Sequence, residues 1–192
     1  MAIEAVIFDL DGTLLHSDLD FDLIRRQIGI AEGPVLEALQ TMSAADRRRA
    51  MEILEQHESQ AASEARLNVH AHEVFAALAE RGIKTALLTR NSRASVKTAM
   101  DRHNLKFDFV CSREDSPGKI KPSPEPVLAI CAALEVRPAD TLMVGDYLFD
   151  LQSANAAGAC SVLLRNDRNA EFIPFAWRVI DRLNQLLELL DY

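Results

Sequence analysis

The stretch Val6-Ile-Phe-Asp-Leu-Asp-Gly-Thr13 decides the fold predicted for this chain of 192 residues. Its apolar residues run directly into Asp9, and Asp11 follows two positions later, just before Gly12. An apolar run that ends in polar residues and glycine is typical of a buried strand opening into a loop. In open α/β sheets, ligands bind just past the carboxyl ends of strands. Two carboxylates there can act as nucleophile and general acid/base, although an ordinary strand followed by an Asp-Gly turn gives the same pattern.

Further apolar runs of the strand type recur along the chain, and helical patterns separate them. Strands are expected at Ala5–Phe8, Thr85–Leu88, Phe107–Cys111, Thr141–Val144 and Ser161–Leu164. Helices are expected at Val74–Arg81, Ser92–His103, Pro124–Leu134 with Ser123 as N-cap, Leu148–Ala157 and, as one amphipathic element, Phe175–Leu190. Strands that alternate with helices form βαβ units. The sequence therefore predicts the α/β class, with a doubly wound, mostly parallel sheet of the Rossmann-like kind.

The segment from about Leu15 to Val69 interrupts this alternation because it contains no convincing strand. Ser43-Ala-Ala-Asp46 is a capping box that begins a long helix running to about Arg66. Two shorter helices are expected at Asp20–Ile28 and Pro34–Thr41. The expected division of the chain is residues 1–14 and 71–192 for a core, residues 15–70 for a small helical cap domain, and Leu14–Ser17 and Leu67–Ala71 for the hinges.

Composition and charge narrow the class of function. The hydrophobic fraction of 48% is sufficient for a buried core, and the net charge of −8 argues against broad binding to nucleic acid or to an anionic membrane surface. Three scattered cysteines, none in a C-x-x-C pair, fit a reducing cytosol better than a disulfide framework. The sequence shows no signal-peptide pattern and no membrane-spanning apolar stretch. We therefore expect a cytoplasmic monomer or homodimer that acts on a small molecule, with no nucleic-acid or membrane partner.

Polar side chains that could contact a phosphate follow two of the other predicted strands. Thr89 and Asn91 come directly after Thr85–Leu88, and polar groups beside a helix N-terminus suit an oxyanion or a phosphate. Lys121 precedes a proline just before the next helix, where a fixed ammonium can neutralise charge on a transferring phosphoryl group. Lys119 competes with Lys121 for this role, and a loop lysine is more commonly solvated.

A second pair of carboxylates, Asp146 and Asp150, follows the run Thr141–Val144. Their spacing of four residues places both on one side of a turn or an early helix. Several oxygen ligands of this kind suit Mg²⁺. Because the carboxyl ends of parallel strands meet at one edge of a sheet, the groups that follow all four strands are expected to converge on one site.

This ordered set of residues resembles the haloacid dehalogenase-like hydrolase superfamily. The match consists of four motifs, which are Asp9-x-Asp11-Gly12-Thr13, Thr89, Lys121 before Pro122, and Gly145-Asp146-x-x-x-Asp150. The resemblance covers roughly residues 3–14 and 71–165. The proline-rich stretch after Lys121 and the sequence Asn155-Ala-Ala-Gly158 look most like the phosphoglycolate phosphatase-like branch, whose cap domain has the position of residues 15–70 here.

The resemblance implies a Mg²⁺-dependent phosphatase that hydrolyses a small phosphate monoester through an aspartyl-phosphate intermediate. Asp9 would attack phosphorus, and Asp11 would protonate the leaving oxygen and then activate water. Family members that act on halides or phosphonates lack an acid at the position of Asp11, so its presence favours phosphate chemistry. The implied ligands are Asp9, Asp11 through its backbone carbonyl, Asp146 and Asp150 for the metal, and Asp9, Thr89, Asn91 and Lys121 for the phosphoryl group.

Two other functions stay open at this point. A sugar phosphomutase of the β-phosphoglucomutase kind would use the same acids, but it needs a cap that holds the intermediate while it reorients, and the expected cap is short. A non-catalytic binding module is the second alternative, because fold does not determine function.

The sequence also departs from the family pattern. His16 stands where relatives usually carry an acid, and His70 and His72 stand where a Pro-Gly pair often opens the return helix. These histidines could contact the site, although histidines on loops are more often solvated or capping. Arg47-Arg48-Arg49 could recognise an anionic leaving group, but three consecutive helical positions point in three directions, which favours a solvated face.

Overall fold

The computed structural model describes residues 2–190 and has a six-stranded sheet at its centre. Every pair of neighbouring strands in this sheet is parallel, in the order β5-β4-β1-β6-β7-β8. This confirms the predicted α/β class and all five predicted strands. The strands are β1 (Ala5–Phe8), β4 (Lys84–Leu88), β5 (Phe109–Cys111), β6 (Thr141–Gly145), β7 (Cys160–Leu164) and β8 (Arg178–Ile180).

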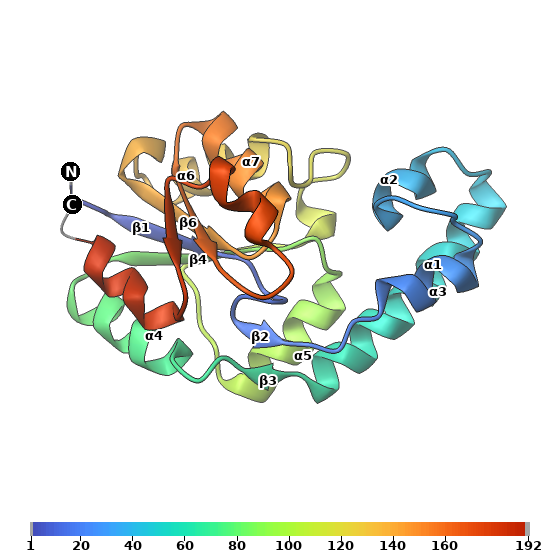
Figure 1. Ribbon diagram of the computed structural model, residues 1–192, viewed down its shortest axis with the longest axis horizontal. Helices are drawn as coiled ribbons and strands as arrows, with labels where there is room; N and C mark the ends of the chain where they lie inside the picture. The colour runs from blue at the N-terminus through green and yellow to red at the C-terminus, as the bar shows by residue number, and fades with distance from the viewer. Residues whose placement is uncertain (1, 191–192) are drawn as a thin grey trace.

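Helices cover both faces of the sheet, and Figure 1 shows α6 and α7 on one side and α4 on the other. Alternate residues of a strand face opposite sides, so β1 contributes to two core layers. Val6 and Phe8 pack in the cluster that includes residues of α4 and α5, whereas Ala5 and Ile7 pack in the cluster that includes residues of α6. The helices are α4 (Ala71–Glu80), α5 (Arg93–His103), α6 (Glu125–Ala133) and α7 (Leu148–Ala157).

The start of α6 differs from the prediction, whereas the state of the cysteines agrees with it. Pro124, rather than Ser123, is the N-cap of α6, because the Ser123 hydroxyl donates to the Glu125 carboxylate and caps no backbone group. The three cysteines are free, as predicted. Within residues 2–190, no helix combines the length and the apolar character needed to cross a membrane.

The prediction of one C-terminal helix over Phe175–Leu190 is wrong. The segment instead contains part of a 3-10 helix, η3 (Ala170–Phe175), then β8, and then a second 3-10 helix, η4 (Leu183–Leu189). The buried residues Leu183, Leu186 and Leu189 recur every three positions, which is the period of a 3-10 helix rather than of an α-helix. β8 adds a sixth strand beside β7.

A helical insertion, residues 15–70, joins β1 to α4 and carries a small core of its own. It contains α1 (Phe21–Ile28), α2 (Val35–Gln40) and α3 (Ala44–Glu64), close to the predicted bounds. Ser43 caps α3 as predicted, since its hydroxyl accepts from the Asp46 backbone N–H at 3.2 Å. The core of the insertion is formed by Ile24, Val35, Leu39, Ala50 and Leu54.

The prediction that the insertion contains no strand is also wrong. β2 (Leu15–His16) and β3 (Arg66–Leu67) pair as an antiparallel ribbon at its two ends. Strands of two residues are too short to show the alternation by which strands are found in a sequence. The ribbon lies at the predicted hinges, while the exact division into core and cap stays a prediction.

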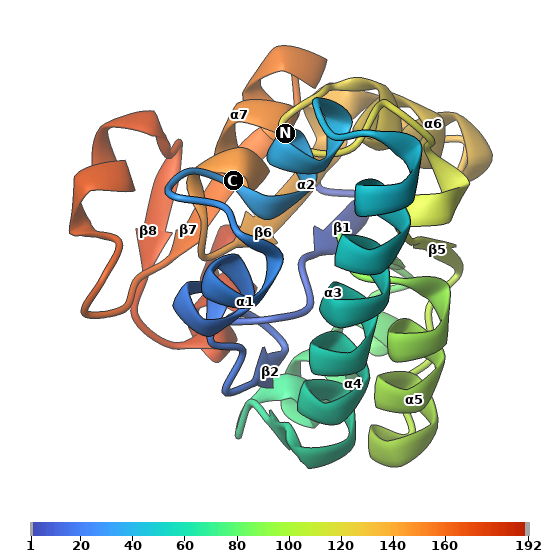
Figure 2. The ribbon, with the colours of Figure 1, turned by 90° about the vertical axis from the view of Figure 1, so that its right-hand side faces the viewer.

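Chain order explains where a ligand would bind in this fold. After β1 the chain forms β4 and β5 on one side, and then β6, β7 and β8 on the other. Ligands of doubly wound sheets bind at such a topological switch point, beyond the carboxyl ends of the strands. In Figure 1 these ends point toward the insertion, and Figure 2 shows α2 and α3 in front of them, with α3 beside α5.

Candidate active site

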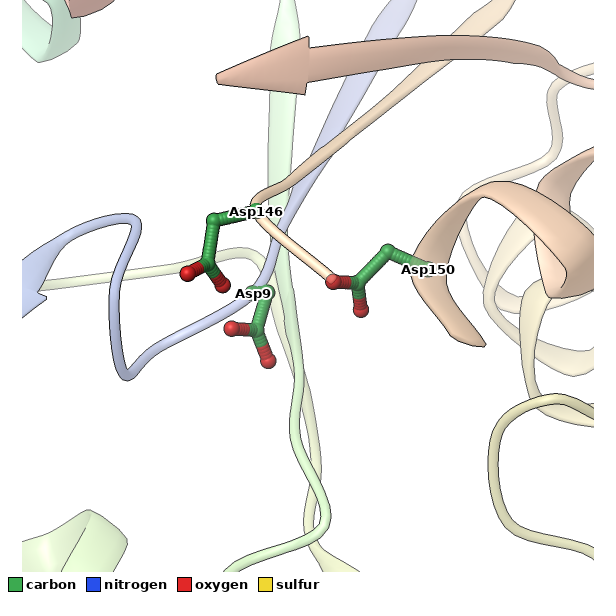
Figure 3. Close-up of side chains that lie close together, drawn as sticks. All are labelled: Asp9, Asp146 and Asp150. Carbon is green, nitrogen blue, oxygen red and sulfur yellow. The ribbon is translucent and has the colours of Figure 1, made fainter. Parts of the chain in front are cut away.

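Three carboxylates converge at the carboxyl edge of the sheet. Asp9 follows β1, Asp146 follows β6, and Asp150 lies in the first turn of α7. One oxygen from each lies within 4.8 Å of the others, and Figure 3 shows the three carboxylates gathered in one place. The Asp9 backbone N–H donates to the Val144 carbonyl at 2.9 Å, so the pairing of β1 with β6 extends into the site and holds Asp9 there.

Two glycines leave the space that these acids occupy. A Cβ atom at Gly12 would lie 2.2 Å from Asp146 Oδ2, and one at Gly145 would lie 2.2 Å from Asp150 Cγ. Gly12 also has a φ of +80°, which side-chain-bearing residues rarely adopt. Both glycine positions of the motifs are therefore required by the packing of the site.

Lys121 lies between two of the acids. Its Nζ donates to Asp9 Oδ1 at 2.5 Å and to Asp150 Oδ1 at 2.6 Å, and the lysine side chain is 3% exposed. Burial alone would lower the pKa of Lys121, but Asp150 and Asp9 outweigh burial and raise the pKa above its ordinary value. Burial raises the pKa of Asp9 well above its usual range, because the opposing effect of Lys121 is smaller and Asp150 and Asp146 add to the rise.

Asp146 is held by two side chains that the sequence prediction missed. Asn166 Nδ2 donates to Asp146 Oδ2 at 3.1 Å, and Asn169 Nδ2 donates to the Asp146 carbonyl at 2.7 Å. Both asparagines follow β7, so the same rule of polar residues after a strand could have found them. Burial and the neighbouring Asp150 raise the pKa of Asp146 to about 7.

Asp11, Asn91 and Thr89 lie at the same edge. The Asn91 side-chain amide donates to Asp11 Oδ2. Thr89 is buried just after β4, and its hydroxyl accepts from the Asn91 backbone N–H at 3.2 Å. The loop after β4 therefore orients Asp11 through Asn91, while the predicted phosphate contacts of Thr89 and Asn91 stay predictions.

The structure separates the remaining candidates from the acids. Lys119 is mostly exposed and pairs with Glu125 at 3.8 Å, which leaves Lys121 as the lysine at the site. His16 is exposed on β2. His70 Nδ1 lies 2.9 Å from Glu73, and His72 lines a cavity at the amino end of β4. Among residues 2–190, neither His70 nor His72 has a hydrogen bond to the site acids.

Arg47 has a structural role that the sequence prediction missed. Its guanidinium donates to the carbonyls of Leu39 at 2.9 Å, Gln40 at 2.9 Å and Met42 at 3.2 Å. The carbonyls of Leu39 and Gln40 lie in the last turn of α2, where helices leave acceptors unsatisfied, and that of Met42 follows the helix. Arg48 and Arg49 are exposed, as a solvated face requires.

Comparison with known proteins identifies the family to which this site belongs. The family model described as hydrolase, haloacid dehalogenase-like hydrolase, matches residues 3–158. The chain belongs to the haloacid dehalogenase-like hydrolases. The predicted family resemblance is thereby confirmed, and the four motifs lie within the matched residues.

Individual relatives of this haloacid dehalogenase-like hydrolase match over most of its length. It is 31% identical to an uncharacterized hydrolase of Saccharomyces cerevisiae, over 98% of this chain and 91% of the yeast protein. It is 32% identical to a phosphoglycolate phosphatase of Nitrosospira multiformis, over 83% of this chain and 82% of that protein. The crystal structure of a hydrolase from Pseudomonas syringae shares the fold, with a TM-score of 0.84, 19% identity and coverage of 98% of both chains.

Proposed function

We propose that this protein is a Mg²⁺-dependent phosphatase that hydrolyses the phosphate monoester of a small metabolite through an aspartyl-phosphate intermediate. The observation that carries the proposal is the bridge of Lys121 between Asp9 and Asp150, beside Asp146, at the switch point of the sheet. This arrangement supplies a nucleophile and a buried ammonium at one point. Phosphoryl transfer needs such positioning and charge neutralisation more than it needs other covalent chemistry. The phosphatase among the relatives supports the same reaction class.

The first step uses Asp9 and Asp11. A carboxylate oxygen of Asp9 forms a bond to phosphorus as the bond from phosphorus to the leaving oxygen breaks. Asp11 donates its proton to that oxygen, so the alcohol leaves in neutral form. Lys121 and Thr89 hold the phosphoryl oxygens, and the ammonium reduces the repulsion between the Asp9 carboxylate and the anionic phosphate.

The second step reverses the role of Asp11. As a carboxylate it accepts a proton from a water molecule, whose oxygen attacks the phosphorus of the aspartyl-phosphate. The bond between phosphorus and Asp9 then breaks and inorganic phosphate leaves. The amide of Asn91 orients Asp11 in both steps, since its donation to Oδ2 leaves the other carboxyl oxygen for the proton.

The donor set fits a divalent cation. Asp9, Asp146 and Asp150 offer oxygen atoms within 4.8 Å of one another, and Lys121 is the ammonium that contacts Asp9 and Asp150. Mg²⁺ prefers oxygen ligands of this kind. Asp9, Asp146 and the Asp11 carbonyl would hold Mg²⁺, with Asp150 in support, and the cation would supply Lewis-acid polarisation of the phosphoryl group.

The helical insertion would act as the cap of this site. The chain enters the insertion through β2 and leaves it through β3. Asn68, which follows β3, donates to the Thr13 carbonyl in the loop after β1 at 3.1 Å. A cap in this place would exclude water from the phosphoryl group and contact the leaving group of the substrate.

The test is release of inorganic phosphate from an aryl phosphate by the purified protein of 192 residues. We expect turnover with Mg²⁺ and none with EDTA. Asp9→Asn is expected to lose at least about 1000-fold in kcat, and Asp11→Asn about 100- to 10,000-fold, the range of general acid–base catalysis. Asp101→Asn, which changes an exposed carboxylate on α5, is the matched control and is expected to retain full activity.

Three results would contradict the proposal. They are turnover that survives EDTA, an active Asp9→Asn variant, and a sugar phosphate that is isomerised without release of phosphate. The last result would point to a phosphomutase.

A further inference from the structure

Arg90 is the residue of the loop after β4 whose side chain pairs with the insertion. It stands between Thr89 and Asn91, so its backbone belongs to the edge of the proposed active site. Arg113 Nη1 donates to the Arg90 carbonyl at 3.1 Å, which fixes this part of the loop. The side chain of Arg90 therefore starts from a rigid position beside the predicted phosphoryl site.

The guanidinium of Arg90 lies between a carboxylate of the insertion and an aromatic ring of the core. Its Nη2 donates to both carboxyl oxygens of Glu37, on α2, at 2.8 and 2.6 Å. Its Cζ lies 4.7 Å from the ring centroid of Phe149, the residue before Asp150. A cation over an aromatic face is held in a fixed direction. Arg90 thus spans the space between core and insertion, next to the acids.

Within the described part of the chain, most of the donors of this guanidinium have no hydrogen-bond partner. Arginine carries five N–H donors, and among residues 2–190 the hydrogen bonds of Arg90 all come from Nη2. The side chains of Arg90 and Glu37 are 19% and 39% exposed, so solvent reaches the pair. An anion can therefore bind the remaining donors of Arg90, or exchange with the Glu37 carboxylate at Nη2.

The neighbouring arginine cannot serve the same purpose. Arg113 is 10% exposed and is engaged by Glu58 at 2.7 Å and Glu55 at 3.4 Å, both on α3. Lys121 is engaged by Asp9 and Asp150. Arg113 and Lys121 are each held between two carboxylates, whereas among residues 2–190 Arg90 forms an ion pair with Glu37 alone.

We propose that Arg90 is a specificity-determining residue that binds a second anionic group on the leaving-group side of the substrate, with Glu37 occupying that position in the absence of substrate. The substrate class is a phosphate monoester whose alcohol carries a carboxylate or a second phosphate. This proposal rests on the proposed phosphatase function. Charge supports this assignment. The protein is acidic and its site is rich in carboxylates, so a second anionic group on the substrate would be repelled unless a cation such as Arg90 pairs with it.

Equilibrium binding tests the proposal without turnover. The probes are phosphonopropionate, which carries a phosphonate and a carboxylate, and propylphosphonate, which lacks the carboxylate, titrated calorimetrically with Mg²⁺ present. The wild type is expected to bind phosphonopropionate about 10- to 100-fold more tightly, as expected for charge-assisted hydrogen bonds. In Arg90→Gln this ratio is expected to fall to within about twofold. A propane bisphosphonate distinguishes a second phosphate from a carboxylate as the preferred group.

The matched control is Arg93→Gln, which removes the same charge from an exposed arginine three residues away and is expected to keep the ratio. Glu37→Gln is expected to strengthen phosphonopropionate binding by about threefold or more, and this variant serves if Arg90→Gln fails to fold. The proposal is overturned if the wild type shows no preference, if Arg90→Gln keeps it, if Arg93→Gln loses it equally, or if Glu37→Gln weakens binding. A measurement of phosphate release distinguishes the two proposals. If binding depends on Arg90 but no phosphate ester is hydrolysed, the proposed phosphatase function is refuted and the proposed anion site at Arg90 stands.

Discussion

Replacing Asp146 by asparagine is expected to stabilise the metal-free protein at alkaline pH. Burial and the nearby Asp150 raise the pKa of Asp146 from 3.8 to about 7. The folded protein thus keeps a proton that the unfolded chain releases near pH 4. The stability contributed by this proton is complete below the unfolded value and is lost as the pH rises through 7. An asparagine is neutral at every pH and avoids this loss.

The size of the effect follows from the shift. A rise of about three pKa units corresponds to roughly 4 kcal/mol at about 1.36 kcal/mol for each unit. Relative to low pH, where Asp146 is protonated in both states, this group lowers the free energy of unfolding of the wild type by roughly 1.5 kcal/mol at pH 5 and by roughly 4 kcal/mol at pH 8. The substituted amide can still accept the Asn166 hydrogen bond through its oxygen, so little is lost in exchange. The gain in free energy of unfolding from Asp146→Asn, relative to the wild type, is therefore expected to be larger at pH 8 than at pH 5 by roughly 2.5 kcal/mol.

Urea unfolding in EDTA, followed by circular dichroism at the two pH values, measures this difference. Asp101→Asn removes an exposed carboxylate whose ion pair with Lys97 is solvated, and it controls for the change in net charge. Added Mg²⁺ at pH 8 should stabilise the wild type and leave Asp146→Asn almost unchanged, because the variant lacks a ligand. An Asp146→Asn variant that is no more stable than the wild type at pH 8 in EDTA would refute the electrostatic reasoning.

Two further substitutions test the other buried charges. Lys121→Gln removes the cation between Asp9 and Asp150 and is expected to lower the free energy of unfolding by about 3 kcal/mol in EDTA at pH 8; unchanged urea unfolding would contradict this. Arg113→Met leaves Glu58 buried without its cation and is expected to cost about 3 kcal/mol at pH 8 and less at pH 5, where Glu58 can take up a proton. Adding Glu58→Gln to that variant should recover part of the loss, and a purely additive double variant would show that the two side chains are not coupled.

The site was predictable where it depends on parallel strands. Asp9, Thr89 and Asp146 each follow an apolar run, and the register of β1 with β4 and β6 brings the ends of those runs together. Lys121 was recognisable as a lysine before a proline and a helix. Its preference over Lys119 required the structure, since both are loop lysines in the sequence and only the fold shows which one is buried.

Elements without a long periodic pattern could not be predicted. β2 and β3 have two residues each, so their pairing depends on the approach of Leu15 to Leu67, which are far apart in the sequence. η4 shows a period of three, and its leucines also fit an amphipathic α-helix when they are read without the strand β8 before them. Arg47 caps α2 from a different helix, a contact that no local spacing indicates.

Ion pairs join the insertion to the core, and they differ in how deeply they are buried. Arg113 and Glu58 are 10% and 4% exposed, and Glu58 also accepts from the Ser92 backbone N–H at 3.2 Å. Breaking this buried pair leaves an uncompensated charge, so α3 stays fixed to the loop after β5. The pair of Arg90 with Glu37 is more exposed, so separating it costs less than separating Arg113 from Glu58, because water can reach both partners. A substrate anion that competes for Arg90 would therefore displace the Glu37 carboxylate, while the pair of Arg113 with Glu58 keeps the insertion attached to the core.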